Sequence, residues 1–280
     1  PQTPNPKPQT PNPKPQIMYR SNRLSHLFLL LCVCAGVWAP FSPLKKKNLA
    51  GHFRTPEPQC KDHPVIRVVL IGPPAAGKGT AAERLKSEYC LCHLSTGEML
   101  REEIRKETKE GLLIEHYVSK GILVPDRIII DLIRQKISDG ACAKGMILDG
   151  FPRTLPQAVV LDQILAEDNE ELTHVIEFKI DFDLLIERAS GRRIHPASGR
   201  TYHVKFNPPK VPDVDDITGE PLIKRKDDDE NILRERLNSY SKETKPILKF
   251  YKTQGILNTV DSSHSIDETW RSVADIIENN

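Results

Sequence analysis

The chain has 280 residues, of which 28% are charged and 38% are hydrophobic, a composition ordinary for a soluble globular protein that can bury a core. Its net charge of +2 is too small to favour a nucleic-acid-binding protein by itself. The six cysteines do not suggest a disulfide framework, and neither Cys-x-Cys pair has the spacing of a zinc knuckle. We therefore expect buried thiols, with a bridge between Cys92 and Cys142 as the open alternative.

The N-terminal region has two parts, neither of which belongs to a folded core. Residues 1–16 are two copies of PQTPNPK followed by PQ, a proline-rich repeat that we expect to be extended and disordered. Residues 17–61 are predicted to be a targeting segment and a linker, because two arginines precede a mostly apolar stretch at 24–39 that is short for a membrane span. This predicts that the protein is directed to an organelle, either to the mitochondrial intermembrane space or along the secretory route. A membrane anchor and a cytoplasmic location are the alternatives.

The first motif of the folded region is a glycine-rich loop between a strand and a helix. VIRVVLIG at 65–72 is a nearly continuous apolar run, as expected of a strand buried on both faces of a parallel sheet. GPPAAGKGT at 72–80 follows, and its glycines, its amides and Lys78 suit phosphate binding. Common loops of this kind place a hydroxyl directly after the lysine to reach Mg²⁺, but here Gly79 stands there and Thr80 comes one residue late. The metal must therefore depend on other groups.

Two later motifs offer groups for a second anion and for a metal. HLSTGEMLR at 93–101 places Thr96 and Arg101 near the start of a helix, where an anion can bind; a capped amphipathic helix is the simpler alternative. GMILDGFPRTLPQA at 145–158 contains an apolar strand that ends in Asp149, at the sheet edge where ligands bind in an open α/β fold. An acid at this position can hold Mg²⁺ through water.

Arginines are dense between residues 188 and 236, a pattern that by itself more often indicates a solvated face or a nucleic-acid patch. Their positions favour another role. Arg188 and Arg192 bracket the entry to an insert at 191–228. Arg225 precedes the exit from this insert, and Arg236 lies on the next predicted helix. Guanidinium groups placed in this way can converge on a transferring phosphoryl group.

Taken in order, these motifs resemble those of a long-form adenylate kinase, most closely the eukaryotic mitochondrial-type branch. The resemblance runs from about residue 65 to 275 and rests on GPPAAGKGT, HLSTGEMLR, LVPD at 123–126, GMILDGFPRTLPQA, GRRIHPASGRTYH at 191–203, DDITGEPLIKRKDD at 215–228 and RER at 234–236. It implies an α/β fold, a P-loop three-layer sandwich with a parallel sheet, over residues 62–280. It also implies a helical acceptor-binding insert at 95–124 and a small β-rich lid at 191–228.

The reaction that the resemblance implies is Mg·ATP + AMP ⇌ 2 ADP, carried out by a monomer that binds no nucleic acid. Such a transfer needs alignment and charge neutralisation and no covalent intermediate. The implied catalytic residues are Lys78, Arg153, Arg192, Arg225 and Arg236. The implied ATP-binding residues are Gly72, Pro73, Pro74, Ala75, Ala76, Gly77, Lys78, Gly79, Thr80, Arg188 and Arg192. The implied AMP-binding residues are Thr96, Arg101, Val124, Gly150, Arg153, Gln157, Arg225 and Arg236.

The resemblance also bears on metals. It implies that Mg²⁺ is bound with the nucleotide and through water at Asp149, with Glu98, where most relatives have aspartate, as an open second candidate. Some relatives tie their lid with four zinc ligands of Cys-x₂-Cys type. The matching positions here, which suit a hydrogen-bonded cluster better than structural zinc, are His195, Ser198, Asp215 and Thr218.

Three alternatives stay open at this stage. A GTP:AMP phosphotransferase would share nearly all of these motifs, because contacts to the donor base are poorly visible in sequence. A P-loop binding or switch protein without transferase activity would explain the loop but not the acceptor motifs. Ala75 stands where most relatives have glycine, so this position either has negative φ or strains the loop.

Overall fold

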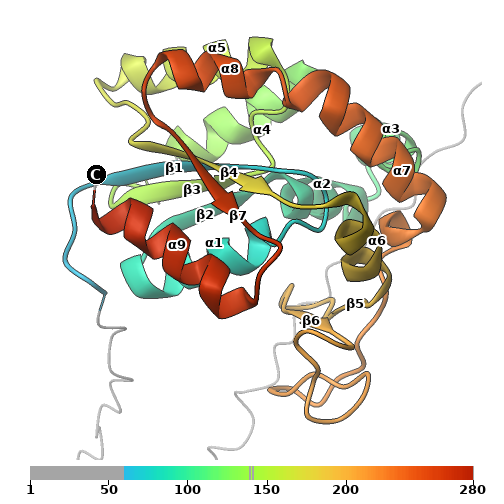
Figure 1. Cartoon of the computed structure of the whole chain (residues 1–280). Helices are drawn as coiled ribbons and strands as arrows, with labels where there is room; N and C mark the ends of the chain where they lie inside the picture. Colours follow the sequence, from blue (N-terminus) through green and yellow to red (C-terminus); the bar gives the residue numbers. More distant parts are fainter. Residues whose placement is uncertain (1–59, 139, 141, 280) are drawn as a thin grey trace, which may run out of the picture. The chain divides into compact units, whose positions relative to one another are not determined.

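The computed structural model describes residues 60–138, 140 and 142–279, which form an α/β domain around a five-stranded parallel sheet (Figure 1). The predicted proline-rich repeat and nearly all of the predicted targeting segment lie outside the described residues. Within the described part of the chain, no helix combines the length and apolar character needed to cross a membrane.

The sheet is parallel at every pairing, as the buried apolar strand at 65–72 predicted. Its strands, in spatial order, are β2 (Cys92–Ser95), β3 (Gly145–Asp149), β1 (Ile66–Ile71), β4 (His174–Lys179) and β7 (Leu257–Asp261). In the centre, Val69 of β1 lies in register with Leu148 of β3 and Val175 of β4. Adjacent β1 residues such as Val68 and Val69 pack into the two separate cores, and both are 0% exposed. A strand covered on both faces therefore has a continuous apolar sequence.

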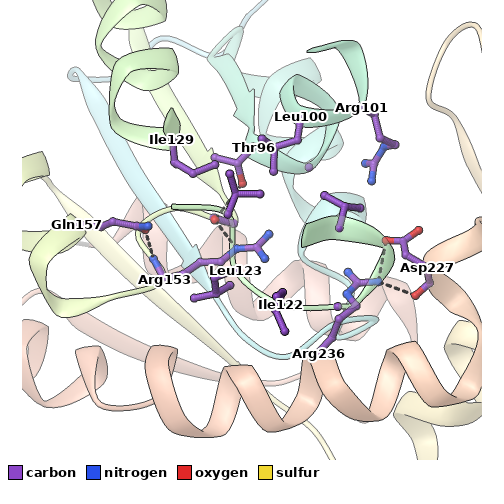
Figure 2. A pocket seen from close by; sticks show the side chains of 15 residues that line it. Thr96, Leu100, Arg101, Ile122, Leu123, Ile129, Arg153, Gln157, Asp227 and Arg236 are labelled. Atoms are coloured by element: carbon purple, nitrogen blue, oxygen red, sulfur yellow. Dashed lines mark hydrogen bonds and ion pairs between the residues drawn. The ribbon is translucent and has the colours of Figure 1, made fainter. Parts of the chain in front are cut away.

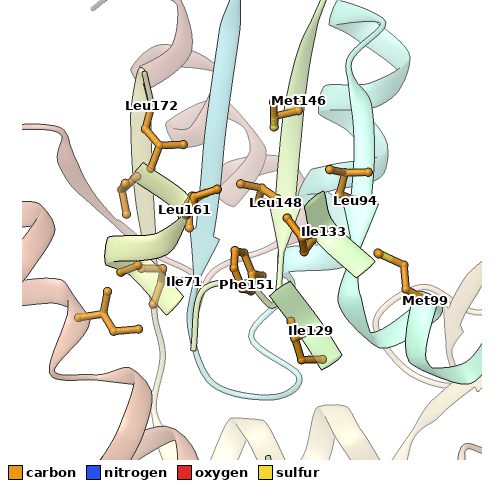
Figure 3. Close-up of a cluster of buried hydrophobic side chains, with 14 of the residues drawn as sticks. Ile71, Leu94, Met99, Ile129, Ile133, Met146, Leu148, Phe151, Leu161 and Leu172 are labelled. Atoms are coloured by element: carbon orange, nitrogen blue, oxygen red, sulfur yellow. The ribbon is translucent and has the colours of Figure 1, made fainter. Parts of the chain in front are cut away.

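Helices cover both faces of this sheet (Figure 1). The helices that pack with Val68 in one core include α1 (Lys78–Tyr89), α6 (Phe182–Ser190) and α9 (Ile266–Glu278). The helices that pack with Val69 in the other core include α4 (Asp126–Ser138), α5 (Leu155–Glu167) and α8 (Ile247–Thr253). Figure 3 shows side chains of this second core, with Leu161 and Ile133 beside Leu148. The predicted three-layer α/β class is confirmed.

Two smaller parts extend from the layered domain. The helices α2 (Thr96–Arg105) and α3 (Lys109–Ser119) follow β2 and precede α4. A two-stranded antiparallel sheet, β5 (Arg192–Ile194) and β6 (Thr201–His203), follows α6. The chain then returns through η1 (Lys226–Asp228), α7 (Glu230–Ser239) and the π-helical turn η2 (Tyr240–Thr244). We refer to the segment from β5 to η1 as the lid.

Two disulfide bonds join Cys60 to Cys90 and Cys92 to Cys142, so the expectation of free thiols in the domain is wrong. The pairing follows from the sheet. β2 lies beside β3 with Cys92 opposite Met146, and Cys142 comes four residues before Met146. The Cα atoms of Cys92 and Cys142 are 5.0 Å apart. Sequence spacing alone does not show which strands are neighbours, so it could leave this bridge only as an alternative.

Candidate active site

The motifs identified in the sequence meet at one edge of the sheet, because β1, β2 and β3 are parallel and end on the same side. The glycine-rich loop at 72–80 leaves β1, Thr96 follows β2, and Asp149 is the last residue of β3. Thr96 is 2% exposed, and its hydroxyl donates to the carbonyl oxygen of Gly150 at 2.9 Å. Residues distant in sequence are thus held together by the strand order itself.

The loop between β1 and α1 depends on glycine at two positions and is strained at a third. A Cβ added to Gly72 would lie 2.9 Å from Cβ of Phe178 and 3.0 Å from its carbonyl oxygen, so no side chain fits there. Gly77 caps α1 with φ of 92°. Ala75 has φ of 64°, a left-handed conformation that costs an L-residue about 1–2 kcal/mol. Of the two possibilities that the sequence left open for Ala75, a negative φ or a strained loop, the structure shows the strained loop.

Lys78 lies inside this loop with its ammonium group turned onto the backbone. Its Nζ donates to the carbonyl oxygens of Gly72 and Pro73, each at 2.8 Å. Burial lowers the pKa of Lys78 to about 8, with Asp149 opposing the shift and nearby arginines adding to it. A partly buried cation that lies among other cations favours the binding of an anion.

Asp149 is the carboxylate nearest to this loop. A Cβ at Gly79 would lie 3.7 Å from Asp149 Oδ2, so the carboxylate stands next to the position where common loops carry a hydroxyl. Burial by itself raises the pKa of Asp149, but the charges of His93 and Lys78 outweigh it and hold the pKa below its usual value. The residue is therefore ionised at neutral pH and suits a hard cation that binds oxygen.

His93 lies beside Asp149 and was not among the predicted site residues. Its Nδ1 lies 3.2 Å from Glu83 Oε1, and its Nε2 lies 3.9 Å from Asp149 Oδ2. Burial lowers the pKa of His93, but the two carboxylates raise it to about 9. The sequence offered no signal for it, because its approach to Asp149 follows from the pairing of β2 with β3, in which Ser95 lies in register with Asp149.

A pocket opens between α2 and the turn after β3 and encloses about 660 Å³, part of it open to solvent. This is within the range of small-molecule sites. Figure 2 shows Gln157 at one end of the pocket, Arg153 near its middle, and Arg101 and Arg236 at the other end. The predicted acceptor-binding residues that line it are Thr96, Arg101, Val124, Gly150, Arg153, Gln157 and Arg236.

Gln157 is 2% exposed, and both ends of its amide have partners. Its Oε1 accepts from the backbone N–H of Arg153 at 2.7 Å (Figure 2). Its Nε2 donates to Asp126 Oδ1, also at 2.7 Å. Thr154, the N-cap of α5, accepts from the Gln157 backbone N–H and donates its hydroxyl to Asp126 Oδ2 at 3.0 Å. Asp126 was not among the predicted site residues, although it ends the LVPD motif.

Acidic residues of η1 hold two of the predicted arginines. Arg192 donates from two guanidinium nitrogens to Asp228, whose side chain is 0% exposed. Arg236 Nη1 donates to Asp227 Oδ2 at 2.9 Å. These pairs orient the guanidinium groups without using all of their five donors.

Glu98 connects two more of the predicted arginines. Its Oε1 accepts from Arg101 at 2.5 Å and from Arg225 at 2.9 Å. Burial lowers the pKa of Arg225 to about 10, with the neighbouring Arg101 adding to the effect. Burial likewise lowers the pKa of Arg153 to about 10, with Arg236 contributing. Positive charge is therefore concentrated beside the loop.

Arg188 lines neither the pocket beside Gln157 nor the cavity beside the glycine-rich loop. Its guanidinium donates to the His264 carbonyl oxygen at 3.2 Å and lies 5.8 Å from the ring centre of Phe206 in the lid. Thr80 is exposed on α1, one residue beyond Gly79. Neither residue lines the pocket beside Gln157.

Comparison with known proteins agrees with this geometry. A family model described as adenylate kinase matches residues 70–256. An adenylate kinase of Vanderwaltozyma polyspora is 50% identical over 216 residues, which cover 77% of this chain and 97% of that protein. An adenylate kinase of Kluyveromyces lactis is 49% identical over 209 residues, 74% of this chain and 92% of that protein. One of Aspergillus terreus is 46% identical over 216 residues, 77% of this chain and 84% of that protein.

The chain belongs to the adenylate kinase family. It is a long-form adenylate kinase, an ATP:AMP phosphotransferase, so the enzyme class that the motifs indicated is confirmed.

The lid of this adenylate kinase is held by polar contacts among the four positions where some relatives bind zinc. His195 Nδ1 lies 2.6 Å from Ser198 Oγ. Thr218 Oγ1 donates to Asp215 Oδ2 at 2.9 Å and lies 3.3 Å from His195 Nε2. His195 and Asp215 are each 2% exposed. The hydrogen-bonded cluster expected from the sequence is present, and the absence of structural zinc stays a prediction.

Three further residues of the kinase complete this cluster and were not predicted. Arg200 donates to both carboxylate oxygens of Asp215, at 2.9 and 2.6 Å. The Tyr202 hydroxyl donates to Asp215 Oδ1 at 3.1 Å. His195 Nε2 lies 2.5 Å from Glu220 Oε2. Arg200 is thus a structural arginine of the lid, which the density of arginines in the sequence could not distinguish from those predicted to bind phosphate.

Proposed function

We propose that the glycine-rich loop binds the ATP phosphates, that the pocket beside Gln157 binds AMP, and that the phosphoryl group passes between them past Arg153 and Arg236. One observation carries this assignment. A second cavity lies against the loop residues Gly72, Pro74 and Lys78, and Arg153 and Arg236 line this cavity as well as the acceptor pocket. The two guanidinium groups therefore stand between the two proposed phosphate sites.

The proposed roles follow from charge and position. Lys78 and the loop amides neutralise the transferring phosphate, while Arg153 and Arg236 bind the acceptor phosphate and the group in transit. Arg192 and Arg225 approach from the lid and, with lid closure, exclude water that would hydrolyse ATP. Thr96 and Arg101 contact the acceptor phosphate. No residue forms a covalent intermediate, because alignment and charge neutralisation are sufficient.

Mg²⁺ is the proposed cofactor, and it would neutralise charge on the phosphates when bound with the nucleotide. Asp149 would hold it through water, since its carboxylate is ionised and lies beside Gly79. Glu98 is a weaker candidate, because Arg101 and Arg225 already use its carboxylate.

We further propose a monomer of the mitochondrial-type branch that uses ATP, AMP and ADP and stacks the donor base on Arg188. The proposed units are the domain at 62–280, the acceptor-binding insert at 95–124 and the lid at 191–228, preceded by the targeting segment and linker at 17–61. Support comes from the order of the motifs and from the apolar stretch that precedes the domain. Arg188 suits such stacking because a guanidinium plane packs well on an aromatic face.

A nucleotide screen tests the overall proposal. The full chain is incubated with each donor and acceptor pair, and ADP formation is followed by a coupled assay. ATP with AMP should be the fastest pair and should require Mg²⁺. A faster reaction with GTP would replace the proposed donor, and no ADP from any pair would contradict transferase activity.

The acceptor assignment has its own test. Gln157→Ala should raise the KM for AMP about tenfold or more and leave the KM for ATP nearly unchanged, because AMP is the one nucleotide of the two whose base would lose hydrogen bonds. Steady-state kinetics with each nucleotide varied in turn measures both constants. Equal increases for both nucleotides would show that Gln157 does not read the acceptor.

A further inference from the structure

We propose that Asp126 determines which purine the acceptor pocket takes, by fixing the orientation of the Gln157 amide. In that orientation the amide recognises a 6-amino purine and rejects a 6-oxo purine. The inference rests on the proposed function, in which Gln157 reads the acceptor base.

The Gln157 amide is held from two sides by groups that cannot exchange roles. The Arg153 backbone N–H, 2.7 Å from Oε1, can only donate. The Asp126 carboxylate, 2.7 Å from Nε2, can only accept while ionised. Rotating the amide by half a turn would place two donors together at Arg153 and two acceptors together at Asp126. The two partners therefore specify one orientation in a side chain that is 2% exposed.

Asp126 is itself fixed. The Thr154 hydroxyl donates to its Oδ2 at 3.0 Å, and the same hydroxyl accepts from the backbone N–H of Gln157 at 3.3 Å. Asp126 is also the first residue of α4, where the helix dipole favours a negative charge. The three side chains form a closed arrangement, so neither the carboxylate nor the amide can turn alone.

The fixed amide has one lone pair on Oε1 and one hydrogen on Nε2 still free. Gln157 lines the acceptor pocket, where a base can meet these groups. A 6-amino purine donates from its amino group and accepts at N1, which complements this pair. A 6-oxo purine accepts at O6 and donates at N1, so it would need the opposite amide orientation. Without Asp126, only the Arg153 N–H would oppose that rotation.

The test compares AMP with inosine monophosphate, which replaces the 6-amino group by an oxygen and adds no other substituent. With ATP as donor, Asp126→Ala should lower the ratio of kcat/KM for AMP to that for inosine monophosphate about tenfold, because the amide can then serve both bases. The matched control is Asp131→Ala. Asp131 lies on the same helix with a side chain 70% exposed and an Arg127 contact of 3.8 Å, so the ratio should stay at the wild-type value.

A purely structural role for Asp126 would lower both rates equally and leave the ratio unchanged, which would overturn the inference. If Asp126→Ala does not fold, Asp126→Asn keeps the shape while allowing rotation of its own amide, and the ratio should still fall about threefold. Titration calorimetry of the two monophosphates on the same variant must show the same loss of preference; an unchanged preference contradicts the proposal.

Gln157→Ala separates this inference from the proposed function. If Gln157→Ala leaves the AMP preference intact, the assignment of Gln157 to the acceptor base is wrong. If Gln157→Ala removes the preference and Asp126→Ala does not, only the role of Asp126 is wrong. In the Gln157→Ala background, Asp126→Ala should cause no additional change in the ratio.

Discussion

The candidate active site and the lid are both rich in charge, but their charges are arranged in opposite ways. In the candidate active site, burial and mutual repulsion lower the pKa of Lys78 to about 8 and those of Arg153 and Arg225 to about 10. In the lid, the hydrogen bonds from Arg200 hold the pKa of Asp215 far below its usual range, and the pKa of Arg200 is raised. The candidate active site keeps an excess of positive charge, although four of its arginines pair with Glu98, Asp227 and Asp228, whereas the lid cluster is satisfied within itself.

This difference shows how a polar cluster in a fold can be classified. A cluster whose donors and acceptors use one another stabilises structure, as in a lid too small for an apolar core. A cluster with an excess of one sign costs stability and is retained for an incoming ligand of the other sign. If the two clusters differ in this way, substitutions in the candidate active site should change activity more than stability, and substitutions in the lid cluster should change the stability of the lid.

The largest effect is expected for Lys78→Met. It should lower kcat about a thousandfold because it removes a charge directed at the transferring phosphate, and it should leave the melting temperature nearly unchanged. Lys86→Met, on the exposed side of the same helix, serves as control and should be active. Coupled ADP assays and thermal melts of both variants test this prediction. Near-normal turnover by Lys78→Met would show that Lys78 has no catalytic role.

Asp215→Ala should have the opposite profile. It removes the acceptor shared by Arg200, Tyr202 and Thr218, so the lid should open locally and be cleaved about tenfold faster by protease while the core melts normally. Asp216→Ala, exposed beside it, is the control. EDTA followed by restored Mg²⁺ should leave the wild-type melt unchanged, and stoichiometric zinc in the purified protein would refute the polar account of the lid.

Because the pKa of Lys78 is low, we expect the enzyme to take up a proton when it binds ATP at alkaline pH. Above pH 8 the free enzyme has a neutral lysine, and ATP binds the protonated form, so affinity should fall as pH rises through 8. At pH 9, ATP binding should take up about 0.9 proton, against about 0.1 at pH 7. Calorimetry in buffers of different ionisation enthalpy measures this number. Equal uptake at both pH values, or the same uptake by Lys78→Met, would assign the proton to another group.

The smallest effect concerns the strained loop. Ala75→Gly should raise the free energy of unfolding by about 0.5–1 kcal/mol, because glycine adopts φ of 64° without steric cost. Ala76→Gly is the matched control and should destabilise by a similar amount, since Ala76 is 1% exposed and packs in the core. Urea unfolding compares the two; a loss of stability in both would mean that Ala75 is not strained.

Local motifs were sufficient to predict the sheet edge and most of the candidate site. A glycine-rich loop after an apolar strand, and an acid at the end of another, appear in consecutive residues, and parallel strands bring them together. Asp126, His93 and Arg200 could not be identified in this way. Each acts through a partner that is 31, 56 or 15 positions away, namely Gln157, Asp149 and Asp215. Such pairs become visible only when the packing of the strands, the helices and the lid is known.

The bond between Cys92 and Cys142 closes a ring of chain that contains α2, α3 and α4. This ring determines whether the chain stays in one piece after a single cut by a protease. A protease that cuts once between α2 and α3 would leave both fragments attached, so the nicked molecule would migrate as a single band on a denaturing gel without reductant. The two fragments would separate only after reduction. The chain that lines the pocket beside Gln157 could thus be cut between α2 and α3 while the two resulting fragments remain covalently joined.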